Sequence, residues 1–534
     1  MGKTPSVADI VESELMVEAL FTKPQEWSGQ WWRPDEPEER VPGVLYYTPK
    51  SGLRLRLIGG WAHRVTLDSG NGITLVTDKT KQWPVIIGSA RGKYITLLDT
   101  QFAGATGASL SGDAPATMDV AAQTALIGCR LDDVFAAEFV GIAVTIDNLT
   151  RWSGRSGIGM KYSFPQEGEV HGETAIDLLE DLVVEVEGLT VKIRHKIGAP
   201  FSEATQARLV ARVSEEIALE YGSATPRPVQ EWLDLVGSSA DLLSLSTLSA
   251  CGVTTATLYL PPEVGAYPDD HPQKNRCQPI NVYRRQAKLG DPDKKAVDHE
   301  DFILRLEDVG LEKLMTRWFL VRDKFAAARN MVLSLSYVPG GYLETAVVSA
   351  VASAESFHRA LGGAPHIPAE EFQELRAVLL KAIPQARKQW LADRLTGNEP
   401  SLKQRLLALH DRLGPAGLAL VSDPERWAQI ASRARNSLAH TGESPALSYT
   451  HLHAVVETTR AVVILNLLLE LGLSSEQLQD AVTRHRLLRR ARRLASEWLS
   501  RRPASEPGII AAISEAPSSS DDIPGVAAPP RFSN

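Results

Sequence analysis

The chain has 534 residues, which is enough for several domains of ordinary size. Hydrophobic residues make up 43% of the sequence and charged residues 23%, as in an ordinary soluble globular protein. The net charge of −8 gives no overall attraction to nucleic acid, so any such binding must depend on a local basic patch.

The cysteine content and the N-terminus indicate a cytoplasmic protein. Cys129, Cys251 and Cys277 are far apart and form no C-x-x-C motif, which argues against a disulfide framework or a cysteine zinc site. The N-terminus has early acidic residues and no apolar segment of signal-peptide length. The most apolar stretch, 461–469, is shorter than the roughly 20 residues that span a membrane, so we expect a buried helix there and no membrane contact.

The first part of the chain is predicted to be rich in strands. After an N-terminal arm over residues 1–30, apolar and polar residues alternate, as in the segment 53–57, which is typical of a strand with one buried face. Similar short segments recur up to about residue 225, many of them separated by Gly, Asp or Asn. They predict an antiparallel β-sandwich or barrel-like domain over residues 31–300, in which 229–248 form a helix.

From residue 301 onward the apolar residues recur at helical spacing. We expect an all-α bundle over residues 301–502 with short connections between its helices. The residues after it, 503–534, are rich in Pro, Ser and Ala and are predicted to be disordered. The predicted helices of the bundle include segments at 343–358, 372–383, 400–413, 422–440, 447–471 and 474–500.

One of these helices carries the candidate catalytic residues. It begins at the N-cap residue Asp423 and ends at Gly442, and the sequence R-N-S-L-A-H near its end contains Arg435, Asn436 and His440. Asn436 and His440 share a face, whereas Arg435 lies about 140° from His440 around the helix. An Arg–His pair therefore requires a loosened helix end, a long reach by Arg435, or a second copy of the helix.

Simpler interpretations of these residues are also open. Cations suit the negative end of a helix dipole, and Arg433 is a rival for the role of Arg435. His451 and His453 lie two positions apart on divergent helix faces, without cysteine or a carboxylate pair, so we expect no metal and no cofactor.

Two further groups of side chains have two interpretations each. The last predicted helix is strongly basic between residues 484 and 502, which could guide RNA phosphates or form a solvated face. Trp27, Trp31 and Trp32 could stack on bases, but packing inside the β-rich domain is the stronger expectation. There is no P-loop, serine nucleophile elbow or dinucleotide fingerprint.

Two regions of the sequence resemble one known family. The helical region with R-N-S-L-A-H at 435–440 resembles the HEPN superfamily of helical-bundle ribonucleases. The stretch G-Q-W-W-R-P-D-E-P-E-E-R-V-P-G-V-L-Y-Y at 29–47 is similar to the N-terminal domain of ApeA-type anti-phage HEPN proteins, as are 53–60, 94–97 and N-V-Y-R-R at 281–285. The resemblance covers nearly the whole chain except its tail.

The resemblance implies a metal-independent RNA endonuclease that aborts phage infection. It also implies a homodimer with two facing motifs, and a phage-derived trigger sensed by the N-terminal domain. Arg435 and His440 match the defining pair of the family motif, and Asn436 matches its polar second position. Glu355 matches an acidic residue on an earlier bundle helix, although Glu355 and His358 could also form a plain local pair.

Three functions follow as hypotheses. The first is a ribonuclease effector whose β-rich domain senses or restrains it. The second is a non-catalytic HEPN-like dimerisation module that binds a protein or nucleotide partner. The third is a β-sandwich ligand binder whose helical part only dimerises.

Overall fold

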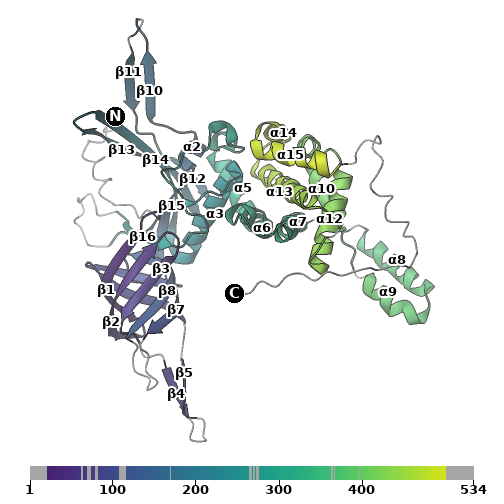
Figure 1. The fold of residues 1–534 in the computed structure, drawn as a ribbon, viewed down its shortest axis with the longest axis horizontal. Helices are drawn as coiled ribbons and strands as arrows, with labels where there is room; N and C mark the ends of the chain where they lie inside the picture. The colour runs from purple at the N-terminus through teal and green to yellow at the C-terminus, as the bar shows by residue number, and fades with distance from the viewer. Residues whose placement is uncertain are drawn as a thin grey trace, which may run out of the picture.

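The computed structural model describes residues 21–500 of the chain. The far N-terminus, up to residue 20, and the tail predicted to be disordered both lie outside the described residues. Strands dominate up to Arg284 and helices follow from Leu306 (Figure 1), so the predicted α+β class, a β-rich barrel-like part followed by a helical bundle, is confirmed. Short gaps in the described range fall at 62–63, 69–73, 79–81, 107–115, 167, 169, 264–267, 269–270, 272–275, 363–364, 366, 396 and 445.

The N-terminal strands close into an antiparallel barrel. Neighbouring strands pair in the order β8, β3, β2, β1, β6, β7, and β7 pairs with β8 to complete the ring. In β3 the leucines at 53, 55 and 57 are buried while Arg54 and Arg56 between them are exposed, which is the predicted alternation. The barrel strands are β1 (Gln25–Arg33), β2 (Glu36–Thr48), β3 (Gly52–Ile58), β6 (Gln82–Ala90), β7 (Lys93–Thr106) and β8 (Thr117–Ile127).

Tryptophans fix the first strand in this barrel. Trp27, Trp31 and Trp32 are all buried, so the packing interpretation of these side chains is confirmed. The Trp31 indole N–H donates to the carbonyl of Gly43 at 3.1 Å, and a Cβ at Gly88 would lie 2.4 Å from its ring. The barrel thus begins at residue 25, inside the range 1–30 predicted to be an arm, because residues from Gln25 onward pair with β2 and Trp27 packs into the core.

A second run of strands extends the sheet beyond the barrel. The end of β8 pairs with β16, and the order continues through β15, β9, β14 and β13 to β12. Helix α3 packs on this sheet, where the Trp232 indole donates to the carbonyl of Phe139 at 3.1 Å. These elements are β9 (Ala137–Ile146), β12 (Leu182–Val186), β13 (Leu189–Ala204), β14 (Leu209–Pro228), α3 (Val229–Thr247), β15 (Val253–Leu260) and β16 (Gln278–Arg284).

Two hairpins project from opposite ends of the sheet-rich part (Figure 1). One pairs β4 (Arg64–Asp68) with β5 (Thr74–Asp78), and the other pairs β10 (Ile158–Ser163) with β11 (His171–Ile176). The short helix α2 (Leu149–Ser153) lies at the base of the second hairpin and contacts β14.

The helical part is organised around α13 (Tyr449–Leu471). Among the described residues, α13 alone is long and apolar enough to cross a membrane, but 78% of its apolar window is buried inside the bundle. It is therefore packed as the core helix that the sequence predicted. Its neighbours include α5 (Leu311–Lys324), α6 (Ala326–Tyr337), α7 (Leu343–Leu361), α10 (Leu402–Arg412), α11 (Pro415–Leu420), α12 (Pro424–Thr441), α14 (Ser475–Arg484) and α15 (Arg486–Trp498).

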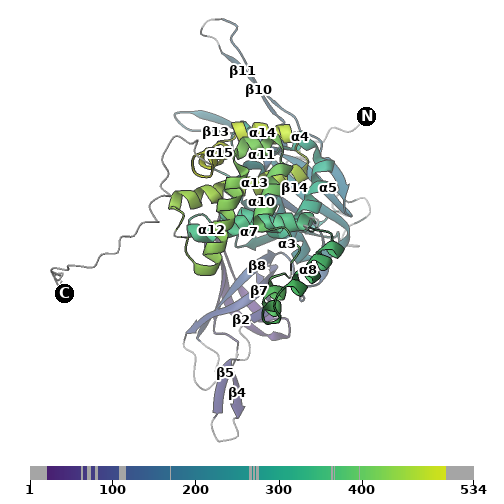
Figure 2. The ribbon, with the colours of Figure 1, turned by 90° about the vertical axis from the view of Figure 1, so that its right-hand side faces the viewer.

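The helical part differs from the sequence prediction in two places. The apolar face predicted over 372–383 lies on α8 (Ala369–Ala382), which with α9 (Lys388–Arg394) stands away from the bundle, so Leu375 and Val378 stay exposed (Figures 1 and 2). The single helix predicted over 474–500 is broken at His485, which has an extended backbone. The His485 ring accepts the Leu487 N–H at 3.3 Å and thereby caps α15.

Candidate functional site

Helix α12 presents the predicted motif because both of its ends are fixed by local chemistry. The Asp423 carboxylate accepts the N–H of Arg426 at 3.1 Å, and Pro424 occupies the first turn. Gly442 ends the helix in the left-handed region at φ 74°. The apolar face packs into the bundle and leaves the motif on the outer side. Its buried residues include Trp427, Ile430, Ala434 and Leu438.

Helix α7 (Leu343–Leu361) lies against α12 and brings Glu355 to the motif. The Glu355 Oε2 and Arg435 Nη2 atoms are 3.5 Å apart, and Arg435 Nη1 donates to Asn436 Oδ1 at 3.3 Å. Both charged side chains are partly exposed, Arg435 by 33% and Glu355 by 21%, so they remain accessible to a ligand. The fold thus joins three of the four predicted residues, although they come from helices distant in sequence.

His440 occupies the last turn of α12 and is exposed. Arg435 pairs with Glu355 and Asn436, and within the described part of the chain the His440 ring forms no hydrogen bond or ion pair. The helix therefore keeps the angular separation between Arg435 and His440 that the spacing predicted. Arg433, the rival cation, is also exposed and forms no ion pair with a described residue.

Glu355 continues into a chain of charged contacts that the sequence did not reveal. It accepts from Arg359 at 3.1 Å, and Arg359 Nη1 lies 2.7 Å from Glu399. Glu399 in turn pairs with Arg405 at 2.6 Å. The spacing of four between Glu355 and Arg359 was the one available signal, since such pairs meet on a helix surface.

The local Glu355–His358 pair considered from the sequence does not form. His358 Nδ1 instead lies 3.3 Å from Arg405 Nη1. Burial lowers the pKa of His358, and the neighbouring Arg405 and Arg359 lower it further. The network behind the site therefore disfavours the charged form of His358, while Glu355 faces Arg435.

The two other histidines near the motif are separately engaged. His451 Nδ1 contacts the Ser448 hydroxyl at 2.7 Å, and its ring lies edge-on to Trp498. His453 Nε2 lies 3.1 Å from Arg490 Nη2 of α15. The basic side of α15 therefore touches the first turns of α13, the helix that follows the motif in sequence. Its arginines at 486, 489, 490, 492 and 493 are all exposed.

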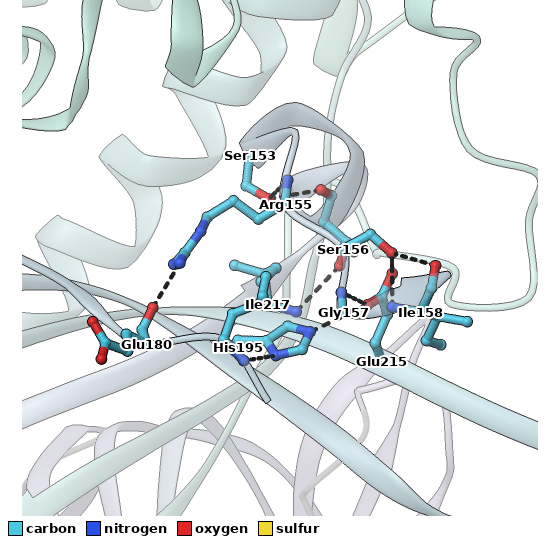
Figure 3. Close-up of polar contacts among 11 residues, drawn as sticks. Ser153, Arg155, Ser156, Gly157, Ile158, Glu180, His195, Glu215 and Ile217 are labelled. Atoms are coloured by element: carbon cyan, nitrogen blue, oxygen red, sulfur yellow. Dashed lines mark hydrogen bonds and ion pairs between the residues drawn. The ribbon is translucent and has the colours of Figure 1, made fainter. Parts of the chain in front are cut away.

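A second polar cluster, at the base of the β10–β11 hairpin, combines Ser156, His195 and Glu215 (Figure 3). The Ser156 hydroxyl donates to Glu215 Oε1 at 2.7 Å, and His195 Nε2 lies 3.1 Å from Glu215 Oε2. His195 Nδ1 accepts the N–H of Leu179 at 3.2 Å, so both ring nitrogens are occupied. Since Ser156 bonds the carboxylate and not the imidazole, the cluster is a structural clamp and not a serine nucleophile with its base.

Comparison with protein families gives two matches. The family model for ApeA N-terminal domain 1 matches residues 26–318, and the model for Apea-like HEPN matches residues 348–477. The second match contains Glu355 and the motif from Arg435 to His440. No curated protein and no solved structure matches the chain.

Proposed function

The chain belongs to the ApeA-type HEPN proteins, which are anti-phage effectors, and from this premise we propose that it is a metal-independent RNA endonuclease. The observation that supports the proposal is the partly exposed contact of Glu355 on α7 with Arg435, which lies beside Asn436 on the helix that also carries His440. These groups can bind a phosphate and move a proton, which is what cleavage of RNA requires.

The proposed reaction uses the nucleophile that RNA carries. A base removes the proton of the 2′-hydroxyl, the 2′-oxygen attacks the adjacent phosphorus, and the P–O bond to the 5′-oxygen breaks as an acid protonates that oxygen. The products are a 2′,3′-cyclic phosphate and a 5′-hydroxyl end. In this scheme His440 transfers protons, because imidazole titrates near neutral pH, and the Arg435 guanidinium binds the phosphate oxygens. Glu355 and Asn436 orient Arg435.

A homodimer resolves the separation between Arg435 and His440. The motif of one chain supplies one imidazole, that of His440, whereas the reaction needs both a base and an acid. Two α12 helices facing each other across a two-fold axis would supply two imidazoles and two guanidinium groups to one RNA strand. We propose that this dimer acts in the cytoplasm and that the β-rich part responds to a phage-derived trigger.

The test is cleavage of labelled RNA by the purified full chain in EDTA. We expect cleavage by the wild type and a loss of about 10²–10⁴-fold in rate for His440→Ala, the usual cost of removing a general acid–base. His171→Ala is the matched control, because His171 is exposed on β11, far from the motif in the fold. Equal rates for wild type and His440→Ala would remove His440 from the mechanism. A wild type that dimerises but never cuts RNA would favour the non-catalytic module.

A further inference from the structure

Helices α8 and α9 form an arm that stands away from the rest of the bundle (Figures 1 and 2). Neither helix has a buried residue. The two helices are nevertheless joined to each other, since the Arg376 guanidinium of α8 donates to the carbonyl of Leu395, just after α9, at 3.0 Å. The arm therefore presents a defined surface to solvent.

Hydrogen bonds and ion pairs fix the root of this arm on the bundle. Asn398, which follows α9, accepts the N–H of Ile367, which precedes α8, at 3.1 Å and donates to its carbonyl at 2.5 Å. The next residue, Glu399, pairs with Arg359 of α7 and with Arg405 of α10. The arm is thus mounted on the charged network that lies behind the motif.

One face of α8 is an apolar stripe that no other element covers. Its residues follow the spacing i, i+3, i+4, i+7, which places side chains on one side of a helix. They are Leu375, Val378, Leu379 and Ala382. All four are exposed, Val378 by 65%. A helix of a soluble protein normally turns such a stripe toward a core, so the stripe on α8 fits a surface that another chain covers.

The charged residues beside the stripe indicate which chain covers it. Glu374 and Lys381 are seven positions apart, about two helical turns, and so lie on the same flank of the stripe. Both are exposed, and neither forms an ion pair with another described residue. When two copies of α8 pack antiparallel across a two-fold axis, Glu374 of each chain comes opposite Lys381 of the other. The stripe is therefore complementary to itself in apolar surface and in charge.

We propose that the stripe on α8 is a docking surface for α8 of a second copy of this chain. This contact rests on the proposed homodimer and gives it a second point of attachment, because α8, α9 and α12 all lie on the side of the molecule remote from the sheet (Figure 1). A helix of 14 residues is about 21 Å long, so two such helices bury less than the roughly 800 Å² per partner of a stable interface. The arm contact therefore strengthens a dimer that α12 also holds.

The experiment is sedimentation velocity on the full chain, without RNA, over a range of protein concentrations. We expect the wild type to form a dimer. Leu375→Ser combined with Val378→Ser should raise its dissociation constant by at least about tenfold, since apolar burial at the contact is lost. Both side chains are exposed in the single chain, so this variant should keep the melting temperature of the wild type at concentrations where both proteins are monomeric.

Charge reversal tests the antiparallel arrangement. Lys381→Glu alone, or Glu374→Lys alone, places like charges opposite each other twice in the dimer and should raise the dissociation constant by about tenfold. The two changes together restore opposite charges and should return the dissociation constant to nearly the wild-type value. Lys50→Glu is the matched control, because Lys50 is exposed in the turn between β2 and β3, far from the arm.

Three results would each overturn the arm contact: a wild type that stays monomeric, an unweakened dimer after Leu375→Ser and Val378→Ser, or a double reversal that is no tighter than the single ones. RNA cleavage by the same preparations separates this proposal from the ribonuclease. A dimer that responds to these changes but never cuts RNA contradicts only the ribonuclease proposal. RNA cleavage by a protein whose dimer ignores these changes contradicts only the arm contact.

Discussion

Glu355 of α7 and Arg435 of α12 meet across a helix interface, with 3.5 Å between Oε2 and Nη2. Arg359 approaches the other oxygen of the same carboxylate, Oε1, at 3.1 Å. The direction of the motif arginine is therefore set by a second helix and by the charged network behind it. This contact matters for catalysis if Arg435 binds the phosphate, because the guanidinium must be aimed before RNA arrives.

We expect Glu355→Gln to lower the single-turnover rate of RNA cleavage by about 10²-fold, since a small misplacement of a positioned group can cost that much. RNA affinity should not fall, because the cationic Arg435 is retained. Rapid-quench cleavage assays and filter binding on the same preparations separate the two effects. Glu425→Gln is the matched control, because Glu425 is exposed on α12 and, among the described residues, forms an ion pair with Lys403 alone, at 2.5 Å. A normal rate for Glu355→Gln would mean that the ion pair is purely structural.

Charge removal on α15 should weaken RNA binding. Arg489→Gln combined with Arg492→Gln removes two exposed cations, so the slope of log K against log salt should become shallower by about 1.4, given about 0.7 per single-strand phosphate contact. Fluorescence anisotropy with a short single-stranded RNA at several salt concentrations measures this slope. Arg208→Gln combined with Arg212→Gln, two exposed arginines at the β13–β14 hairpin, is the matched control. An unchanged slope would identify the basic side of α15 as a solvated surface.

The clamp at the base of the β10–β11 hairpin should contribute to stability in a pH-dependent manner. Burial raises the pKa of Glu215, but hydrogen bonds from Ser156, His195 and the Gly157 N–H outweigh it and lower the pKa below its ordinary value. The clamp therefore stabilises the fold above about pH 4.5, and this contribution is lost as the pH falls through the lowered pKa.

Glu215→Gln tests the clamp by removing the charge while keeping the shape of the side chain. We expect it to lower the free energy of unfolding by about 1–3 kcal/mol at pH 7, with the difference shrinking as the pH falls below about 4.5. Urea titrations followed by circular dichroism measure both quantities. Glu203→Gln, an exposed change on β13, should have no effect. A pH-independent difference would show that the Glu215 charge does not act through the clamp.

His485, at the break between α14 and α15, should give the stability a second dependence on pH. Here the titrating group is a buried imidazole and not a carboxylate. Burial lowers its pKa, Asp301 acts against this, and Arg484 and Arg486 lower it further. The unfolded chain, with an ordinary imidazole pKa of about 6.5, binds the proton first on acidification. Stability is therefore fully present above about pH 6.5 and is lost as the pH falls below that value.

His485→Asn keeps a side chain that can cap α15 but removes the titrating group. Its melting temperature should fall less between pH 7.5 and pH 5.5 than that of the wild type. Differential scanning fluorimetry across this range is sufficient, with His171→Asn as an exposed control. His358 and His451, whose pKa values are also lowered by burial, are present in both proteins and so cancel in the comparison. Parallel curves of melting temperature against pH for the wild type and His485→Asn would contradict the prediction.

The features readable from the sequence are those encoded within a few residues. Asp423 and Gly442 mark the two ends of α12, and the alternation over 53–57 predicts the buried face of β3. Each depends on local hydrogen bonding or on the spacing of apolar residues within one element. Neither depends on where that element packs. The resemblance added Glu355 as a candidate, but no spacing rule could place it beside Arg435.

Tertiary packing determined the features that join distant parts of the sequence. The contact between Glu355 and Arg435 and the closure of β7 onto β8 each join residues that are distant along the chain. Packing also set the exposure of α8 and the break at His485, because an apolar helical pattern does not specify whether a neighbouring element will cover it. Local periodicity fixes which face of an element is apolar, and only the packed fold determines what that face meets.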